Sequence, residues 1–309
     1  MSSNVVVHKW AILVAVGLTL FMNTMDGTIV NVALPTLTRE LGTDFPTVQW
    51  VVLSFLLGLT ILMLSMGRLG DMVGKKRVFA VGLVLFVLAS VLCGLADGVY
   101  WLIAFRFLQA IGSAMTLALG VAIVTETWPP PERGRAIGTT AGIISLGIAA
   151  GPVLGGLILQ ALNWRWIFFV NLPVGLVALV LVWRFVPALP PVRQAERFDF
   201  LGAGLAGTAL LAFALAMTFT QTRGLFGWPT LTLLFLAGAA LVLFVRVEQG
   251  LPAPMLDLAL FRHRSFSLNL FTGFLTFVAM AGVVLLLPFY LHLVLGLYQR
   301  QVGLLMGVV

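Results

Sequence analysis

Two ionisable side chains, Asp26 and Arg106, stand inside long apolar runs of the sequence. A charged side chain at the centre of a membrane helix costs roughly 2.5–3.5 kcal/mol, so such a residue is expected to have a function. If the first run crosses outward from Ala11 and the fourth crosses inward from Trp101, both charges lie about 8 Å below the same membrane surface. They could therefore pair directly, or share a water-filled cavity with Gln109.

This pair of charges allows two interpretations. Asp26 and Arg106 could form a static ion pair that locks two helices together. Alternatively, Asp26 could lose and regain a proton as the cavity faces each side of the membrane, with Arg106 controlling that exchange. The second interpretation makes the pair part of a transport mechanism.

The composition places both charges in a membrane protein. Of 309 residues, 61% are hydrophobic and only 9% are charged, whereas a soluble domain carries about 25% charged residues. The apolar residues form runs of about 20, the helix length that crosses a ~30 Å hydrocarbon core. The sequence therefore predicts an all-α transmembrane fold with many spans in the lipid bilayer.

The segments between the runs exclude other classes of protein. The 18 Lys and Arg residues form short clusters and not one solvated basic face, so no nucleic-acid partner is expected. The single cysteine, Cys93, cannot form a disulfide framework or a paired-cysteine metal site, and no metal is expected. Gly70, Gly74 and Lys75 lack the spacing of a phosphate loop. We therefore expect no cofactor and no nucleotide hydrolysis on this chain.

Apolar runs and helix breakers predict nine complete spans and the beginning of a tenth. The expected ranges are 11–34, 47–67, 78–97, 100–125, 136–160, 165–186, 200–220, 229–247, 268–292 and, incompletely, 300–309. Two longer connections, rich in proline and charge, begin at Val186 and Glu248. They divide the chain into a six-helix bundle (1–186), a two-helix insertion (187–248) and the start of a C-terminal bundle (249–309).

The positive charges predict the orientation. Alternate loops hold 13 Lys and Arg residues on one side and 4 on the other, with Arg106 inside a span. Cytoplasmic loops carry the excess of positive charge, so the N-terminus is expected in the cytoplasm. A tenth span begun near Arg300 would cover only ~15 Å of the core, so we expect a fragment whose C-terminal half is missing.

Glycines recur every fourth residue in the fifth run. They are Gly134, Gly138 and Gly142, then Gly147, Gly151 and Gly155. Small residues at this spacing let helix backbones approach closely, and Pro152 permits a bend. Ordinary tight packing is one interpretation, and a surface that slides or seals is the other.

Several motifs together resemble the major facilitator superfamily, in particular its fourteen-span drug:proton antiporters. "GRLGDMVGKKR", from Gly67, is similar to the loop between spans two and three. "RFLQAIGSA", from Arg106, resembles the fourth-span motif, and "GIAAGPVLGG", from Gly147, the fifth-span antiporter motif. "DGTIVNVALP", from Asp26, "NWRWIFFVNLPVG" and "PMLDLALFRHRSF" also resemble that family. The resemblance covers essentially the whole chain.

The resemblance implies roles for individual residues. Asp26 would be the proton-coupling carboxylate and Arg106 its partner. The expected cavity residues are Asn31, Gln109 and Gly112. The expected cytoplasmic latch consists of Gly67, Asp71, Gly74, Lys75, Lys76 and Arg77. The expected antiporter stripe, a hinge and seal, consists of Gly147, Gly151, Pro152, Gly155 and Gly156.

Two positions depart from the family pattern. Met72 stands where an arginine usually follows the latch aspartate. His292 replaces a usual glutamine, and a histidine can titrate near neutral pH. A titrating role and a plain hydrogen-bonding role both stay open for this residue.

The expected function is proton-coupled export of small hydrophobic or cationic molecules, such as drugs or antibiotics, by alternating access in a bacterial cytoplasmic membrane. The protons and the small-molecule substrate are the expected partners. One alternative is an exporter or importer of a specific metabolite, lipid or siderophore on the same fold. Another is a truncated remnant that transports nothing.

Overall fold

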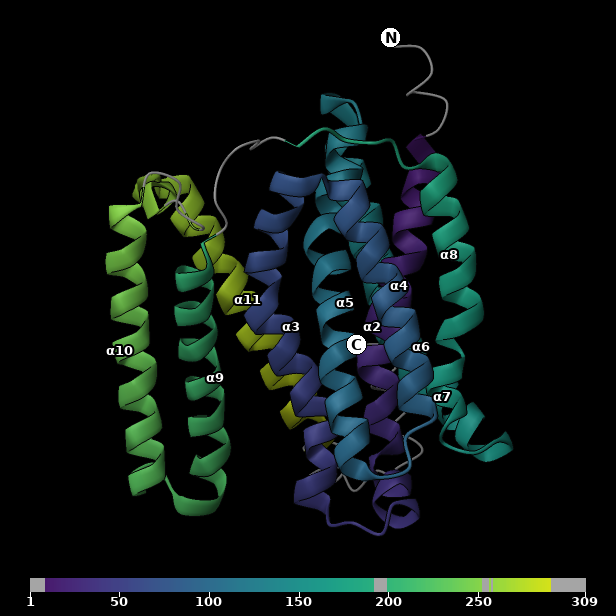
Figure 1. Cartoon of the computed structure of the whole chain (residues 1–309), viewed down its shortest axis with the longest axis vertical. Helices are drawn as coiled ribbons and strands as arrows, with labels where there is room; N and C mark the ends of the chain where they lie inside the picture. Colours follow the sequence, from purple (N-terminus) through teal and green to yellow (C-terminus); the bar gives the residue numbers. More distant parts are fainter. Residues whose placement is uncertain (1–8, 192–198, 252–255, 257, 290–309) are drawn as a thin grey trace. The chain divides into compact units, whose positions relative to one another are not determined.

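A computed structural model describes residues 9–191, 199–251, 256 and 258–289 of the chain (Figure 1). Every regular element in this part of the chain is a helix. The helices are α2 (Lys9–Glu40), α3 (Phe45–Val73), α4 (Lys75–Gly94), α5 (Val99–Thr127), η1 (Pro130–Glu132), α6 (Arg133–Ala161), α7 (Trp166–Phe169), α8 (Asn171–Phe185), α9 (Phe200–Arg223), α10 (Trp228–Gly250), η2 (Leu258–Arg262) and α11 (Arg264–Phe289).

These helices have the length and composition of membrane spans. Among the described residues, eight helical segments are long and apolar enough to cross a bilayer. The segment Lys75–Gly94 has 20 residues, and at 1.5 Å per residue it reaches about 30 Å, the thickness of the hydrocarbon core. The chain is therefore a multi-pass membrane protein, as its composition predicts.

Within the described residues, the observed helices follow the predicted spans in number and order. α11 covers most of the ninth predicted span, 268–292. The tenth predicted span, 300–309, lies outside the described residues.

The segment expected as a loop from Gly67 to Arg77 is mostly helical. α3 continues to Val73 and α4 begins at Lys75, so a single residue, Gly74, separates them. Gly74 has a φ of 106°, a conformation that residues with a Cβ rarely adopt. The loop was predicted because the segment is polar, but polarity marks the exit from the membrane and not the end of a helix.

The sixth predicted span, 165–186, consists of two helices. α7 ends at Phe169 and α8 begins at Asn171. Pro173 lies in the first turn of α8, and its ring nitrogen cannot donate to the carbonyl four residues earlier. The helix is therefore interrupted where the chain turns into the membrane.

The chain forms two compact units, Met1–Met255 and Leu256–Val309. Within the first unit, α2 packs against α3, α5, α6 and α8, so that α2 lies at the centre of the helices that follow it. α9 and α10 pair with each other as a hairpin, and α9 also contacts α3 (Figure 1). The division of this unit into a six-helix bundle and a two-helix insertion stays a prediction.

Candidate functional site: a buried ion pair between α2 and α5

Asp26 and Arg106 form a direct ion pair. Arg106 Nη1 donates to Asp26 Oδ2 at 2.5 Å, and neither side chain is exposed at all. Asp26 lies on α2 and Arg106 on α5. The two charges were predicted to lie at a similar depth in the membrane, and in the structure they are in direct contact and buried together.

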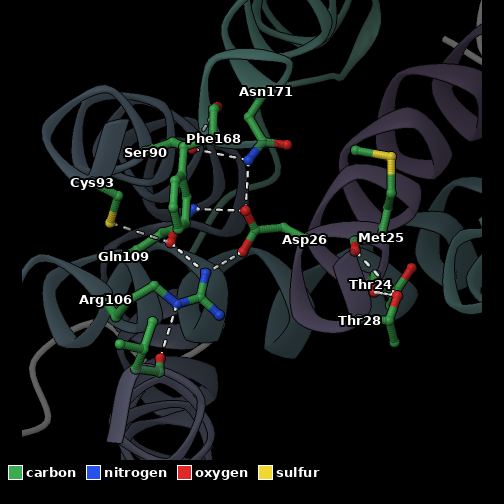
Figure 2. A network of polar contacts seen from close by, with 11 residues as sticks. Thr24, Met25, Asp26, Thr28, Ser90, Cys93, Arg106, Gln109, Phe168 and Asn171 are labelled. Carbon is green, nitrogen blue, oxygen red and sulfur yellow. Dashed lines mark hydrogen bonds and ion pairs between the residues drawn. The ribbon is translucent and has the colours of Figure 1, made fainter. Parts of the chain in front are cut away.

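Two amides complete the coordination of the carboxylate (Figure 2). Gln109 Nε2, one turn from Arg106 on α5, donates to Asp26 Oδ1 at 3.1 Å. Asn171 Nδ2, at the start of α8, donates to the same oxygen at 2.6 Å. Arg106 Nη1 also donates to Gln109 Oε1 at 2.7 Å. Four side chains from three helices thus form one network around Asp26.

The guanidinium of Arg106 is held from α3 as well. Its Nε donates to the Val51 carbonyl oxygen at 3.1 Å, and its carbon atom lies 4.1 Å from the centroid of the Phe55 ring. A cation above an aromatic face is stabilised by about 2 kcal/mol or more when both groups are desolvated. The positive charge is therefore oriented toward Asp26 by contacts on the opposite side.

Ser90 extends the network to α4. Asn171 Nδ2 donates to Ser90 Oγ at 2.9 Å, and Ser90 Oγ donates to the Phe168 carbonyl oxygen at 2.9 Å. The interruption between α7 and α8 places Asn171 at this depth, because it begins a new helix there. Asn171 and Ser90 were not among the predicted site residues.

Small residues allow α5 to approach its neighbours closely enough for these contacts. A Cβ added to Gly112 would lie 2.5 Å from the Gly82 carbonyl oxygen and from the Phe86 nitrogen of α4. Gly112, expected to line a cavity, therefore lies in the packed α4–α5 interface. Asn31, also expected in the cavity, is exposed on α2 and makes none of the network's hydrogen bonds.

An apolar cavity of about 870 Å³ lies elsewhere on α5, and Asp26, Arg106 and Asn171 do not line it. It is lined by α3, α5 and α9, mostly with aliphatic and aromatic side chains such as Ile61, Phe107 and Leu211. Ser54, one of its few polar lining residues, precedes Phe55, the residue whose ring covers Arg106. The cavity has the size of a small-molecule site, since such sites measure about 300–1,000 Å³.

The expected latch residues lie together at one end of the helices. Lys75 is nearly fully buried, and its Nζ lies 3.0 Å from Asp71 Oδ1 and 2.7 Å from Glu126 Oε1. Lys76 Nζ donates to the Trp183 carbonyl oxygen at 3.0 Å. These contacts join the beginning of α4 to α3, α5 and α8.

Two other expected latch residues, Arg77 and Gly67, pack less closely against the rest of the protein. Arg77 is exposed, and a Cβ added to Gly67 would meet nothing within 4 Å. Glu126, which pairs with Lys75, was not predicted, because a carboxylate near a helix end gives no signal of its own. A role of this cluster as a latch against a second bundle stays a prediction.

The glycines of α6 fall into two groups that differ in how closely they pack against other helices. Gly147, Gly151 and Gly155 face α2, where an added Cβ would collide with Thr24, with Thr28 and with Ile29 respectively. Added Cβ atoms at Gly134, Gly138, Gly142 and Gly156 would meet nothing within 4 Å. Gly147, Gly151 and Gly155 therefore form the tight seam between α2 and α6, and the other glycines of the stripe do not.

Pro152 lies in the same seam and frees a carbonyl. Proline has no N–H, so the carbonyl oxygen four residues earlier, that of Ile148, lacks its usual helix donor. Thr28 Oγ1 of α2 lies 3.2 Å from this oxygen. In Figure 2, Thr28 points away from the network around Asp26, although only Gly27 stands between them in the sequence. His292, the possible titrating residue, lies outside the described residues.

One carboxylate joins three helices at this site. The charge of Asp26 is balanced by Arg106, and its oxygens accept three hydrogen bonds. Removing one member of a buried pair leaves the other charge uncompensated, so the contact between α2 and α5 depends on the charge of Asp26.

Comparison with known proteins agrees with this architecture. Riboflavin transporter RibZ of Clostridioides difficile (strain 630) is 34% identical over 97% of this chain and 65% of its own length. Multidrug resistance protein Stp of Mycobacterium tuberculosis (strain ATCC 25618 / H37Rv) is 37% identical over 95% of this chain and 55% of its own length. The chain thus spans between about half and two-thirds of these curated relatives.

The solved structure of the proton:xylose symporter XylE has the same fold. It matches with a TM-score of 0.60 at 15% identity, over 97% of this chain and 66% of that chain. The family model described as Major Facilitator Superfamily matches residues 16–309. Helical architecture, sequence relatives and family model agree, and the chain belongs to the Major Facilitator Superfamily of membrane transporters.

Proposed function

We propose that this chain belongs to a proton-coupled exporter of small hydrophobic or cationic molecules, with Asp26 as the coupling carboxylate. The observation that carries the proposal is the fully buried Asp26–Arg106 pair. A charge pair that only fastens two helices can often be replaced by apolar side chains without loss of stability. A buried ion pair inside a membrane span is better explained by a proton that must be taken up and released.

The proposed transport cycle depends on whether Asp26 is ionised or protonated. Ionised Asp26 holds α5 through Arg106, and protonation releases that bond. Alternating access in such folds is a rigid-body movement of helices around a central substrate site. The seam between α2 and α6 brings the two helix backbones close together, because glycines line it, so that these two helices can move as one body.

Membrane orientation and substrate class complete the proposal. The distribution of positive charges favours a cytoplasmic N-terminus, and the bacterial relatives RibZ and Stp support a place in a bacterial cytoplasmic membrane. The apolar cavity between α3, α5 and α9 favours an apolar molecule, and the name of the relative Stp points to several drugs as substrates.

The experiment uses the full natural gene product that contains this sequence, purified and inserted into liposomes. The probe is ethidium, a small apolar cation, and transport is driven by an imposed pH difference. We expect Asp26→Asn to reduce driven transport at least about a hundredfold, in the range by which proton-transfer groups contribute. Exchange of ethidium across the membrane without a pH difference should continue.

The control variant is Asp26→Glu, which keeps a carboxylate and should retain part of the driven transport. The proposal is wrong if Asp26→Asn, properly inserted, moves ethidium as fast as the unaltered protein does under the same pH difference.

A second candidate is transport of one specific metabolite. It is favoured by the relative RibZ, which is named as a riboflavin transporter. Riboflavin and ethidium uptake into inside-out vesicles separates the two functions. Saturable movement of riboflavin alone would favour the specific transporter, and movement of ethidium would favour the multidrug exporter.

A further inference from the structure

Three buried side-chain oxygens near the ion pair have no hydrogen-bond partner among the described residues. One is Oδ1 of Asn171, whose amide nitrogen already bonds to Asp26, and the other two are Asn23 Oδ1 on α2 and Ser113 Oγ on α5. Asn23 is 1% exposed and Ser113 is fully buried. Most buried polar atoms in proteins are hydrogen-bonded, to protein or to ordered water, so the unpaired oxygens of Asn23 and Ser113, on two neighbouring helices, indicate a site.

Ser113 faces α2. It lies midway between Arg106 and Gly120, seven residues from each, and residues seven apart share one side of a helix. Arg106 bonds to Asp26 of α2. An added Cβ on Gly120 would lie 2.8 Å from the side chain of Leu20, also on α2. The stripe of α5 that carries Ser113 is therefore turned toward α2.

Asn23 faces α5 by the same reasoning. It lies midway between Leu20 and Asp26, three residues from each, and both of these residues contact α5. Asn23 and Ser113 consequently occupy the middle of the same antiparallel contact, below the ion pair on the side of Lys9. The distance along α2 from Asn23 to Asp26 is only about 4.5 Å, at 1.5 Å per residue.

We propose that Asn23 and Ser113 together bind water and form the step through which Asp26 exchanges its proton with the side of the membrane on which Lys9 lies. This inference rests on the proposed function of Asp26. The Asn23 oxygen accepts a hydrogen bond, and the Ser113 hydroxyl can donate one and accept another. A bound water needs two to four such partners.

The proton transfer is balanced within this step. Asp26 in its acid form releases the proton from its oxygen to the bound water, which passes a proton onward to the next water on the side of Lys9. The O–H bond of the carboxylic acid breaks, an O–H bond of the water forms, and Asp26 is left as the carboxylate that pairs with Arg106. Uptake follows the same route in reverse.

Rapid-scan infrared spectroscopy after a pH jump tests the step without any substrate. The full natural gene product in lipid is used, and the carboxyl band of Asp26 is assigned by its loss in Asp26→Asn. We expect the double variant Asn23→Leu/Ser113→Ala to slow the relaxation of this band about tenfold or more, since positioned proton-transfer groups contribute at least that much. Ser113→Ala alone should give a smaller slowing, and it replaces the double variant if that one does not fold.

The matched control is Thr116→Val on the same helix. Thr116 is fully buried, but its hydroxyl donates to carbonyl oxygens of its own helix, those of Gly112 at 3.1 Å and Ser113 at 3.0 Å. In Thr116→Val the carboxyl band of Asp26 should relax at the rate of the unaltered protein. Ser113→Thr keeps the hydroxyl, so the band should relax at that rate in this variant too.

Each other outcome contradicts a particular statement. Unaltered relaxation in the double variant, or equal slowing by Thr116→Val, overturns the water step alone. If Asp26→Asn removes no carboxyl band from the pH-jump spectrum, Asp26 does not change its protonation, and then the proposed function fails as well.

Discussion

The charge of Asp26 is tolerated at the residue scale because its neighbours replace water. Its two oxygens accept from Arg106, Gln109 and Asn171. Removing one member of a buried pair costs about 3–5 kcal/mol, because the remaining charge is left uncompensated. The amides are thus as much a part of the site as the ion pair.

Asn171 provides the first test at this scale. In Asn171→Leu, Asp26 Oδ1 and Ser90 Oγ each lose a donor, and the loss of such a partner for buried groups costs about 1–3 kcal/mol. We expect a lower midpoint of thermal unfolding, measured by intrinsic tryptophan fluorescence in detergent.

Asn31→Leu is the matched control for this variant, because Asn31 is an exposed asparagine on α2. It should leave the midpoint close to that of the unaltered protein. If both variants shift the midpoint equally, the amide of Asn171 has no special part in holding the network.

The sequence predicted the site because charges stood in apolar runs. Asp26 and Arg106 were found in this way, Gln109 was found because it lies one turn from Arg106, and the three residues are in contact. Asn171 was missed because an asparagine at the beginning of a span looks like an interfacial residue. Asn31 is five residues after Asp26 and so about 140° around the helix, which explains why it does not reach the network.

At the scale of elements, the contact between α2 and α6 is specified by complementary small residues. Thr24 and Thr28 of α2 lie opposite Gly147 and Gly151 of α6, where a Cβ would collide with each threonine hydroxyl. The spacing of four residues on both helices keeps the two rows aligned over successive turns. The sequence predicted the close approach but not which helix would be the partner.

Thr28 should stabilise this contact through the carbonyl that Pro152 frees. In Thr28→Val the Ile148 oxygen loses its donor, and we expect the free energy of unfolding to fall by about 1 kcal/mol. In a Pro152→Ala background the residue-152 N–H can bond to Ile148, so Thr28→Val should then cost little. Equilibrium unfolding in detergent of the four proteins of this double-mutant cycle measures the difference.

Thr24→Val serves as the control for the cycle. Thr24 Oγ1 bonds only to carbonyl oxygens of its own helix, those of Leu20 and Phe21. The free energy of unfolding that Thr24→Val costs should therefore be the same whether residue 152 is proline or alanine. Equal costs of Thr28→Val in the two backgrounds would show that Thr28 does not donate to the freed carbonyl.

At the scale of the whole molecule, composition and periodicity were sufficient for the fold. Runs of about 20 apolar residues require helices, because backbone groups in lipid must bond within their own segment. Helix ends were less predictable: at Gly67–Arg77 the helices continue beyond the apolar run, and only Gly74 separates them. The contact between α2 and α5 could be predicted from two charges at similar depth, whereas no local pattern states that α2 also packs against α6.

The predicted orientation gives a test of the whole molecule. Cys93 is the only cysteine of the sequence and is fully buried, so the unaltered chain should not react with a membrane-impermeant maleimide. Asp97 and Arg133 are exposed and lie beyond opposite ends of α5, so each can carry a new cysteine on a different side of the membrane. In intact cells we expect Asp97→Cys to be labelled and Arg133→Cys to be labelled only after the membrane is permeabilised. Labelling of Arg133→Cys alone in intact cells would reverse the orientation, and it would place the proton step of Asn23 and Ser113 on the outer side.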